Sequence, residues 1–232
     1  MANPYNFFIN PFAELSPVTV EYTSGSGTWT CPAGVTSIYV ECWGSSSGSF
    51  GSYKSEEEPI TQSGDGSGGA AYAAGTVSVT PGNSYAYVVA AGGAAGIGKP
   101  YATPGAGASS TFNSTSIVAV GSSFTTGGNA ASCTGDVRYS GGNASAGDSN
   151  HSGAGGSSAG PLGAGVNASG ATGGNSSDPD AGDGANGITI QGNGVQGTAP
   201  GGGSCGSIST GSNQSHNGAA GRPGKVRITY YA

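Results

Sequence analysis

The sequence predicts an all-β protein in which a small antiparallel β domain carries a glycine-rich region and is closed by a C-terminal strand. No stretch shows a sustained helical period, whereas short alternating apolar runs recur through the first half. The second half is dominated by Gly, Ala, Ser and Asn, and the chain holds 48 glycines among 232 residues. It then ends in the alternating sequence KVRITYY at 225–231. A disordered tail needs no strand after it, so we expect the glycine-rich region to fold and to return the chain to the β domain.

The glycine-rich half cannot rest on a conventional hydrophobic core. Glycine has no side chain to bury and loses much backbone entropy on folding. Disordered segments of low hydrophobicity usually carry high charge. Only 8% of this chain is charged, against about a quarter in typical domains. We therefore expect an ordered region whose cohesion comes from backbone hydrogen bonds.

Period-two alternation and turn residues place the strands of the β domain. Pro81-Gly82-Asn83 predicts the turn of a hairpin, and Asn113-Ser114 separates two shorter strands. The expected strands are 18–22, 28–31, 37–43, 72–79, 84–90, 110–112, 117–120 and 225–231. The expected core is Trp29, Val35, Ile38, Val40, Trp43, Tyr72, Val77, Val79, Tyr85, Val88, Phe112, Val118, Val120, Val226 and Ile228.

The chain divides by composition into three parts. Tyr5, Phe7, Phe8 and Phe12 crowd into an N-terminal stretch that is too short to have its own core, so we expect it to bury them against a partner. The alternative is an N-terminal strand that packs on the protein's own sheet. The expected parts are a docking segment at 1–16, a β domain at 17–125 completed by 224–231, and a glycine-rich domain at 126–223.

Charge and hydropathy exclude several classes of partner. The net charge is −6 and only six residues are Lys or Arg, which is far too few to neutralise a phosphate backbone. We therefore expect no nucleic-acid partner. No apolar run approaches membrane-spanning length, so we expect no membrane insertion. The first residues lack the charge and apolar run of a signal peptide, although the low-charge composition suits an extracellular surface.

The four cysteines leave their chemistry open. Cys31, Cys42, Cys133 and Cys205 allow three disulfide pairings, and none of them forms a C-x-x-C motif, so a zinc site is weakly supported. Cys31 and Cys42 lie in adjacent expected strands and could form a bridge. The alternative, which we favour, is that the cysteines are small buried apolar residues.

Several stretches match motifs of catalysis or cofactor binding, but each lacks the surrounding sequence that the motif requires. Residues 64–69 and 192–197 match G-x-G-x-x-G, but neither opens a helix in a βαβ unit, as dinucleotide binding requires. Residues 93–99 resemble a phosphate-binding loop, but Pro100 stands where Ser or Thr should hold Mg²⁺. No catalytic group of Ser, His and Asp stands out. We expect no enzymatic activity and no cofactor.

A calcium site is a weak alternative at one acidic turn. Asp178, Asp180 and Asp183 are spaced like part of a calcium loop, but the bidentate Glu of such loops is missing. Asp, Gly and Pro are also ordinary turn residues. We expect no metal here.

Four blocks of sequence occur in the order of a known family. They are 27–37 (GTWTCPAGVTS) with 40–44 (VECWG), 68–72 (GGAAY) with 79–82 (VTPG), 107–112 (GASSTF), and 221–230 (GRPGKVRITY). Together they resemble the glycine-rich domain of bacteriophage tail-fibre and adhesin proteins. The chain departs from the family's pattern at 45–60, where a varied loop replaces a nearly pure glycine run after Trp43-Gly44.

The resemblance implies a β domain carrying packed polyglycine II helices. Such helices repeat every three residues and make no internal hydrogen bonds, so their backbone groups point sideways. Only glycine lets neighbours approach closely enough to bond laterally. The runs at 153–156, 163–165 and 201–203 are the expected packed faces. In that family, the loops between packed runs carry the contact with the host receptor.

The resemblance also implies a function, a location and partners. We expect a non-enzymatic bacteriophage virion protein, a receptor-binding adhesin at a tail fibre or tail tip. The alternatives are a capsid decoration, head-fibre or spike protein and, more weakly, an ice-binding or bacterial surface protein. The expected location is the virion surface, reached by host lysis. The expected partners are other virion subunits through the N-terminus and a host glycan or outer-membrane protein, with a homo-oligomer left open.

Side chains with area and hydrogen-bonding reach mark the candidate receptor contacts. Tyr and Arg are enriched among residues that dominate binding energies, and aromatic rings stack on sugar faces. We expect the loops that carry them to cluster at the end of the molecule away from residue 1. The candidates are Phe50, Tyr53, Lys54, Lys99, Tyr101, Arg138, Tyr139 and His151.

Overall fold

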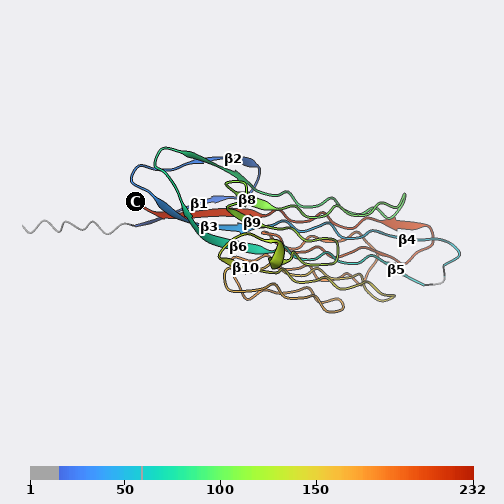
Figure 1. The fold of residues 1–232 in the computed structure, drawn as a ribbon. Coiled ribbons are helices and arrows are strands. Elements are labelled where there is room, and N and C mark those ends of the chain that lie inside the picture. Colours follow the sequence, from blue (N-terminus) through green and yellow to red (C-terminus); the bar gives the residue numbers. More distant parts are fainter. Residues whose placement is uncertain (1–15, 59) are drawn as a thin grey trace, which may run out of the picture.

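The protein is elongated, with β-sheets at one end and turns and short strands at the other (Figure 1). The computed structural model describes residues 16–58 and 60–232. Tyr5, Phe7, Phe8 and Phe12, the proposed docking side chains, lie outside the described residues. No α-helix occurs in the described part of the chain, which contains a single 3₁₀ turn, η1, at Ala130–Ser132. The expected all-β class is confirmed.

Sheet A holds both ends of the described chain. Its strand order is β1-β13-β3-β6-β10, and all neighbouring strands are antiparallel. The C-terminal strand lies between β1 and β3, so the expected closing strand is confirmed. The strands are β1 (Pro17–Tyr22), β3 (Ser37–Trp43), β6 (Tyr72–Ser78), β10 (Val137–Tyr139) and β13 (Lys225–Tyr231).

Sheet B has the order β2-β7-β8-β9 and includes one hairpin predicted from the sequence. Its strands are β2 (Ser26–Thr30), β7 (Ser84–Val88), β8 (Ser110–Phe112) and β9 (Ile117–Ala119). Strands β8 and β9 pair around Asn113 and Ser114, whose positive φ angles of 47° and 60° turn the chain.

The hairpin expected at Pro81-Gly82-Asn83 is wrong. Strand β6 pairs with β3 and β10 in sheet A, whereas β7 pairs with β2 and β8 in sheet B. The turn crosses between the sheets because its backbone bonds to the end of β2: Gly82 N donates to Cys31 O, and Cys31 N donates to Asn83 O. Gly82 has a φ of +82°, which favours glycine.

The core lies between the two sheets and contains most of the expected residues. Trp29 lies 6.4 Å from Phe112 and 5.7 Å from Tyr230, measured between ring centroids. Val88 is exposed, and Val118 is partly buried without packing against the core, so these two predictions were wrong. Tyr85 and Val120 are also partly buried, but both pack against the core. The pairing of Phe112 with Ile117 sets the alternation of β9, which turns Ile117 and Ala119 inward instead.

Cysteine pairing is absent among the described residues, which include all four cysteines. The four thiols are free and buried. Cys42 lies in β3 of sheet A, whereas Cys31 follows β2 of sheet B, so the bridge between them does not form. Burial raises the pKa of the Cys42 thiol. The interpretation as small buried residues is confirmed.

Between the sheets and the far end run extended segments that we call the glycine bundle. They are bonded laterally, and the bonds recur every third residue along a segment, as expected for polyglycine II helices. The segments are 44–51, 64–71, 90–98, 103–109, 120–128, 140–147, 152–160, 163–168, 172–177, 182–188, 192–198, 201–207 and 217–224. Some of these segments lie before residue 125, where the expected β domain was to end, and others lie after it. Several continue directly from the strands of sheet A.

Segment 64–71 shows the lateral pattern on three of its sides. Its backbone N–H groups donate to segment 201–207 on one side and to segment 140–147 on another, and its carbonyls accept from segment 152–160 on a third. The bonds to segment 201–207 run from Gly64 to Ser207, from Ser67 to Ser204 and from Ala70 to Gly201. Those to segment 140–147 run from Gly66 to Ser145 and from Gly69 to Gly142. Those received from segment 152–160 run from Gly153 to Gly64, from Gly156 to Ser67 and from Ala159 to Ala70.

Glycine is required where segments touch. A Cβ on Gly156 would lie against the carbonyl of Gly142, and a Cβ on Gly203 would lie against that of Ser67, both closer than real Cβ atoms approach. The obstruction is backbone, which cannot rotate away as a side chain can.

Buried serines occupy positions in the bundle where a side chain larger than that of glycine fits. Ser49 is fully buried; its Oγ donates to Cys205 O at 2.6 Å and accepts from Ala219 N at 2.8 Å. Ser46 bridges Gly202 and Arg222 in the same way, three residues earlier. The serine hydroxyls therefore bridge backbone groups of neighbouring segments.

Candidate functional site

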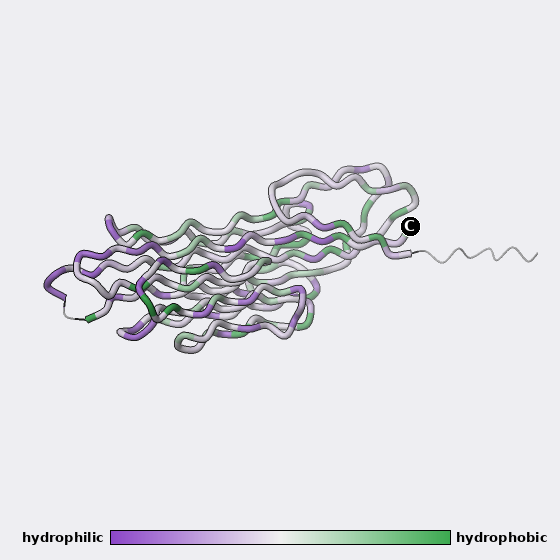
Figure 2. The backbone as a smooth tube through the Cα atoms, turned by 180° about the vertical axis from the view of Figure 1, so that it is seen from behind, coloured by the Kyte–Doolittle hydropathy of each residue, from purple (hydrophilic) through white to green (hydrophobic). Residues whose placement is uncertain are grey.

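We call the end of the molecule farthest from sheets A and B the tip (Figure 1). It comprises residues 52–58, 60–63, 97–102, 188–192 and 208–216. Two short strand pairs hold it together. Strand β4 (Ser52–Lys54) pairs with β12 (Gln214–His216), and β5 (Gln62–Ser63) pairs with β11 (Ile208–Ser209). Hydrophilic residues gather in the loops at this end (Figure 2).

Four of the expected receptor-contact residues meet at the tip. Lys99 Nζ lies 4.1 Å from the centre of the Tyr53 ring and 2.8 Å from its hydroxyl, to which it donates. Lys54, the next residue in β4, donates to Thr210 O at 2.9 Å. Tyr101, in the loop after Lys99, is 65% exposed. Loops that are distant in sequence are therefore joined at one surface.

A hydrogen-bond chain fixes the tip loops to one another. Tyr53 Oη donates to Asn213 Oδ1 at 3.0 Å, and Asn213 Nδ2 donates to Glu56 Oε1 at 2.6 Å. The Tyr53 ring is thus held between an ammonium and an amide and serves as a support. The freely exposed ring at the tip is that of Tyr101.

Three isoleucines at the tip were missed from the sequence. Ile190 is 76% exposed and Ile60 is 59% exposed, and Ile97 is also exposed. Ile97 stands between two glycines, Ile60 follows Pro59, and Ile190 comes two residues after Ile188, so none lies in a run long enough to predict a strand. A large aliphatic residue in a turn that has no strand period is the signal that could have found them. With Tyr101 they place separate exposed apolar side chains among the polar residues of the tip.

The remaining receptor candidates lie elsewhere. Phe50 is partly buried in the glycine bundle, with its ring 6.1 Å from that of Phe124. Arg138 and Tyr139 were expected in a loop, but they lie in strand β10 of sheet A. Tyr139 stacks on Tyr72 with 6.4 Å between ring centroids, and Arg138 donates to Cys133 O at 3.3 Å. Both are at the sheet end, away from the tip.

His151 lies on the flank of the tip within a closed local network. Its Nε2 is 3.1 Å from Asp148 Oδ2, and the carbonyl of Asp148 accepts from Ser63 Oγ in β5. Backbone N–H groups of Asn150 and His151 donate to the Asp148 carboxylate and lower its pKa. The network is that of a turn, and it joins the 148–151 loop to the tip.

The three aspartates of the weak calcium alternative point to different partners. Asp178 accepts from the backbone of Leu162 and Asp180, while Asp183 accepts from Ser176 N. Asp180 is bonded to Arg227 and lies 3.5 Å from Lys225 Nζ. Within the described ranges no cluster of His, Cys, Asp or Glu has the arrangement of a metal site.

With this geometry established, comparison with known proteins gives one match. The family model named glycine-rich domain matches residues 21–231. This chain belongs to the glycine-rich domain family. A search of curated proteins found no match to the chain. Among the residues described for this glycine-rich domain, none forms a helix of the length and apolarity needed to cross a membrane.

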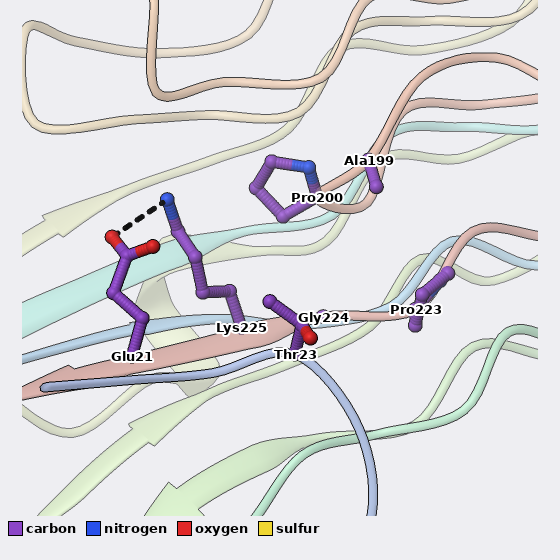
Figure 3. Close-up of a pocket in the computed structure, with 7 residues that line it drawn as sticks. All are labelled: Glu21, Thr23, Ala199, Pro200, Pro223, Gly224 and Lys225. Carbon is purple, nitrogen blue, oxygen red and sulfur yellow. Dashed lines mark ion pairs between the residues drawn. The ribbon is translucent and has the colours of Figure 1, made fainter.

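The glycine-rich domain also has a small cleft of about 240 Å³ where the bundle meets sheet A. Figure 3 shows Pro200 and Pro223 on its sides, with the ammonium of Lys225 directed at the carboxylate of Glu21. Lys225 Nζ lies 3.7 Å from Glu21 Oε1 and 4.2 Å from the centre of the Trp43 ring. Because Lys225 and Glu21 already pair with each other, we interpret the cleft as part of the contact between the glycine bundle and sheet A.

Proposed function

We propose that this chain is a non-enzymatic bacteriophage virion protein that binds the host surface through its tip. The single observation that supports this most is the distance between two specialised ends. One end is a sheet where the described chain begins and ends, and the other carries exposed apolar side chains on cross-linked loops (Figure 1). A backbone-bonded bundle separates them. Such a layout suits a protein mounted at one end and recognising a target with the other.

The tip offers contact chemistry of the kind that dominates binding energies. Tyr101 and Ile190 present large apolar areas that are costly to leave in water, about 1.5–3 kcal/mol for each side chain once fully buried. Lys54 and Lys99 are positioned by hydrogen bonds, so little entropy is lost when they meet a partner. The proposed partner is a host glycan or an outer-membrane protein on the cell surface.

The proposed mount is the sheet end, with residues 1–13 inserted into another virion subunit. The aromatic content of that segment supports this, because those side chains favour burial. Particles assembled with a chain lacking residues 1–13 should not incorporate it, although the purified truncated chain should stay soluble. Incorporation at the wild-type level would overturn the proposed mount.

Adsorption of assembled particles tests the proposed function. Tyr101→Ala and Ile190→Ser, made separately, should slow adsorption to host cells without lowering the amount of protein in the particle. The matched control is Val195→Ser, which removes an exposed aliphatic side chain from the side of the bundle, where Val195 is 52% exposed. Tyr139→Ala serves as the aromatic control at the sheet end.

Wild-type adsorption by both tip variants would refute receptor binding through the tip. The capsid decoration, head-fibre or spike alternative would then be favoured. Copy number separates the two: a tail adhesin is present in a few copies, whereas a decoration protein covers the particle.

A further inference from the structure

Sheet A has one face that does not pack on sheet B, and the half of that face nearest the bundle is covered. Ala159, at a turn of the bundle, packs against Trp43 and Tyr72. Asp180, at a second turn, bonds to Arg227 of β13. These turns cover the face over the ends of β3, β6 and β13 that join the bundle.

The other half of this face is bare, and we call it the open face: Ser37, Tyr39, Thr76, Thr229 and Tyr231. Tyr39 lies between Thr229 on β13 and Thr76 on β6 as direct cross-strand neighbours. A hollow of about 410 Å³ lies over these residues. Tyr39 is 39% exposed and Tyr231 is 61% exposed. Among the described residues, nothing seals this hollow as the turns seal the covered half.

The open face has the chemistry of a seat for aromatic side chains. Tyrosine rings and threonine methyl groups supply apolar walls, and their hydroxyls supply hydrogen bonds at the rim. The residues that line the hollow carry no formal charge at neutral pH. Phosphates and other anions would therefore find no counter-charge here, whereas Phe and Tyr side chains would find rings to pack against.

The chain enters the described structure at the rim of this face. Ala232 N donates to Ser16 O at 3.4 Å, and Pro17 is the register partner of Tyr231. Residues 1–15 precede that point and include Tyr5, Phe7, Phe8 and Phe12.

The segment is long enough to reach the hollow. Strand β3, which carries Tyr39, is two strands from β1, or about 10 Å at the usual strand spacing. Residues 12–17 can span up to about 17 Å when extended. The chain between Pro17 and these residues is therefore long enough for Phe12 to reach the open face and for Phe7 and Phe8 to cross it to Thr76.

We propose that the open face is the seat of this chain's own aromatic segment, residues 5–12. Seating shields the aromatic side chains from water while the protein is free, before the segment meets any other subunit. The inference goes beyond the proposed function and does not depend on receptor binding. A second copy of the chain, placing its segment in the same hollow, is the main competing occupant.

A cysteine pair in the full chain tests the seat. Phe8→Cys with Thr76→Cys places one thiol on the segment and one on the open face, and the native cysteines are buried and do not compete. The control pair is Phe8→Cys with Thr210→Cys, at the exposed tip. Mild oxidation should cross-link the first pair within a monomer, seen as faster migration on a non-reducing gel. No cross-link above the control would overturn the proposal, as would covalent dimers alone, since these would assign the seat to a second copy.

Proteolysis gives an independent readout without new cysteines. Tyr39→Ser removes one ring of the seat, so chymotrypsin should cut within residues 1–13 about fivefold faster than in the wild type, because cleavage follows the unseated population. Tyr101→Ser, which removes a ring at the tip, should leave the rate unchanged. Equal rates in the wild type and the Tyr39→Ser variant would refute the seat.

Discussion

Asp180 Oδ2 lies 2.9 Å from Arg227 Nη1, and this pair joins a turn of the glycine bundle to the C-terminal strand. Arg227 also bonds to Glu21 at 2.6 Å, lies 3.5 Å from Glu41 Oε2, and covers the ring of Trp43. Tyr72 Oη donates to Glu41 Oε1 at 2.8 Å. One cation thus holds three acidic side chains from three parts of the chain, which fixes the bundle on the sheet.

Replacing Asp180 should loosen this joint. Asp180→Asn should lower the free energy of unfolding by about 1–2 kcal/mol, because a charged hydrogen bond is lost at a partly exposed site. Thermal melting at pH 7 measures the change. Glu57→Gln, at the exposed tip, is the control and should have little effect. An Asp180→Asn variant as stable as the wild type would show that the pair does not fix the joint.

The same pair should make stability depend on acid pH. The hydrogen bond from Arg227 lowers the pKa of Asp180 below its usual value of 3.8. The stabilisation is therefore fully present above about pH 4 and is lost as pH falls through the lowered pKa of the folded state. In melts from pH 7 to pH 2, the difference between wild type and Asp180→Asn should be constant above that range and shrink below it. A difference that stays constant down to pH 2 would contradict this.

A single methyl group inside the bundle should be costly. Gly156→Ala places a Cβ against the carbonyl of Gly142, so we expect a loss of about 1–3 kcal/mol from strain in the surrounding backbone. Gly192→Ala is the matched control, since its Cβ would meet only Ile188 Cδ1 at 3.8 Å. Chemical denaturation of the two variants checks the difference. Equal stabilities would mean that the segments are less tightly packed than described.

Buried hydroxyls should matter as much as glycines. Ser49→Ala leaves the carbonyl of Cys205 and the N–H of Ala219 without the bonds that Ser49 Oγ makes, which should lower stability by about 1–3 kcal/mol. Ser24→Ala, at an exposed turn, should be close to neutral. Chemical denaturation midpoints of the two variants measure the difference. If Ser49→Ala is as stable as Ser24→Ala, the Ser49 hydroxyl fills space and its hydrogen bonds add little stability.

The closing strand should be indispensable. Val226 is fully buried in β13, so Val226→Asp places an unpaired charge in the core and should cost more than about 3 kcal/mol, enough to unfold a marginal protein. Val195→Asp, on an exposed site, should be tolerated. Circular dichroism melts measure both. A Val226→Asp variant that melts like the wild type would remove the strand from the core.

Local patterns predicted the strands well and their partners less well. The bounds of β3 followed from the alternation of Ile38, Val40 and Cys42 with exposed or polar neighbours. The turn at Gly82 was also recognised, but turn residues do not say which strands the emerging chain will join. The phase of β9 depended on the cross-strand pairing of Phe112 with Ile117, which the sequence of β9 alone does not contain.

The tip was predicted in part, for a similar reason. Tyr53 and Lys99 stood out because large polar side chains are rare in this composition, and the fold brings them together. Arg138 and Tyr139 stood out equally, but the short strand β10 between glycine-rich stretches looks like a loop in sequence. Ile190 was missed because its alternation with Ile188 is too short to predict a strand or a surface site.

The lateral bonding of the bundle has a mechanical consequence. The segments run along the long axis (Figure 1), and their hydrogen bonds join neighbouring segments laterally. A pull from one end to the other therefore loads these bonds in shear, so that many resist at once, whereas a peeling force would open them one after another. We therefore expect this glycine-rich architecture to resist tension along its long axis better than a force that peels its segments apart.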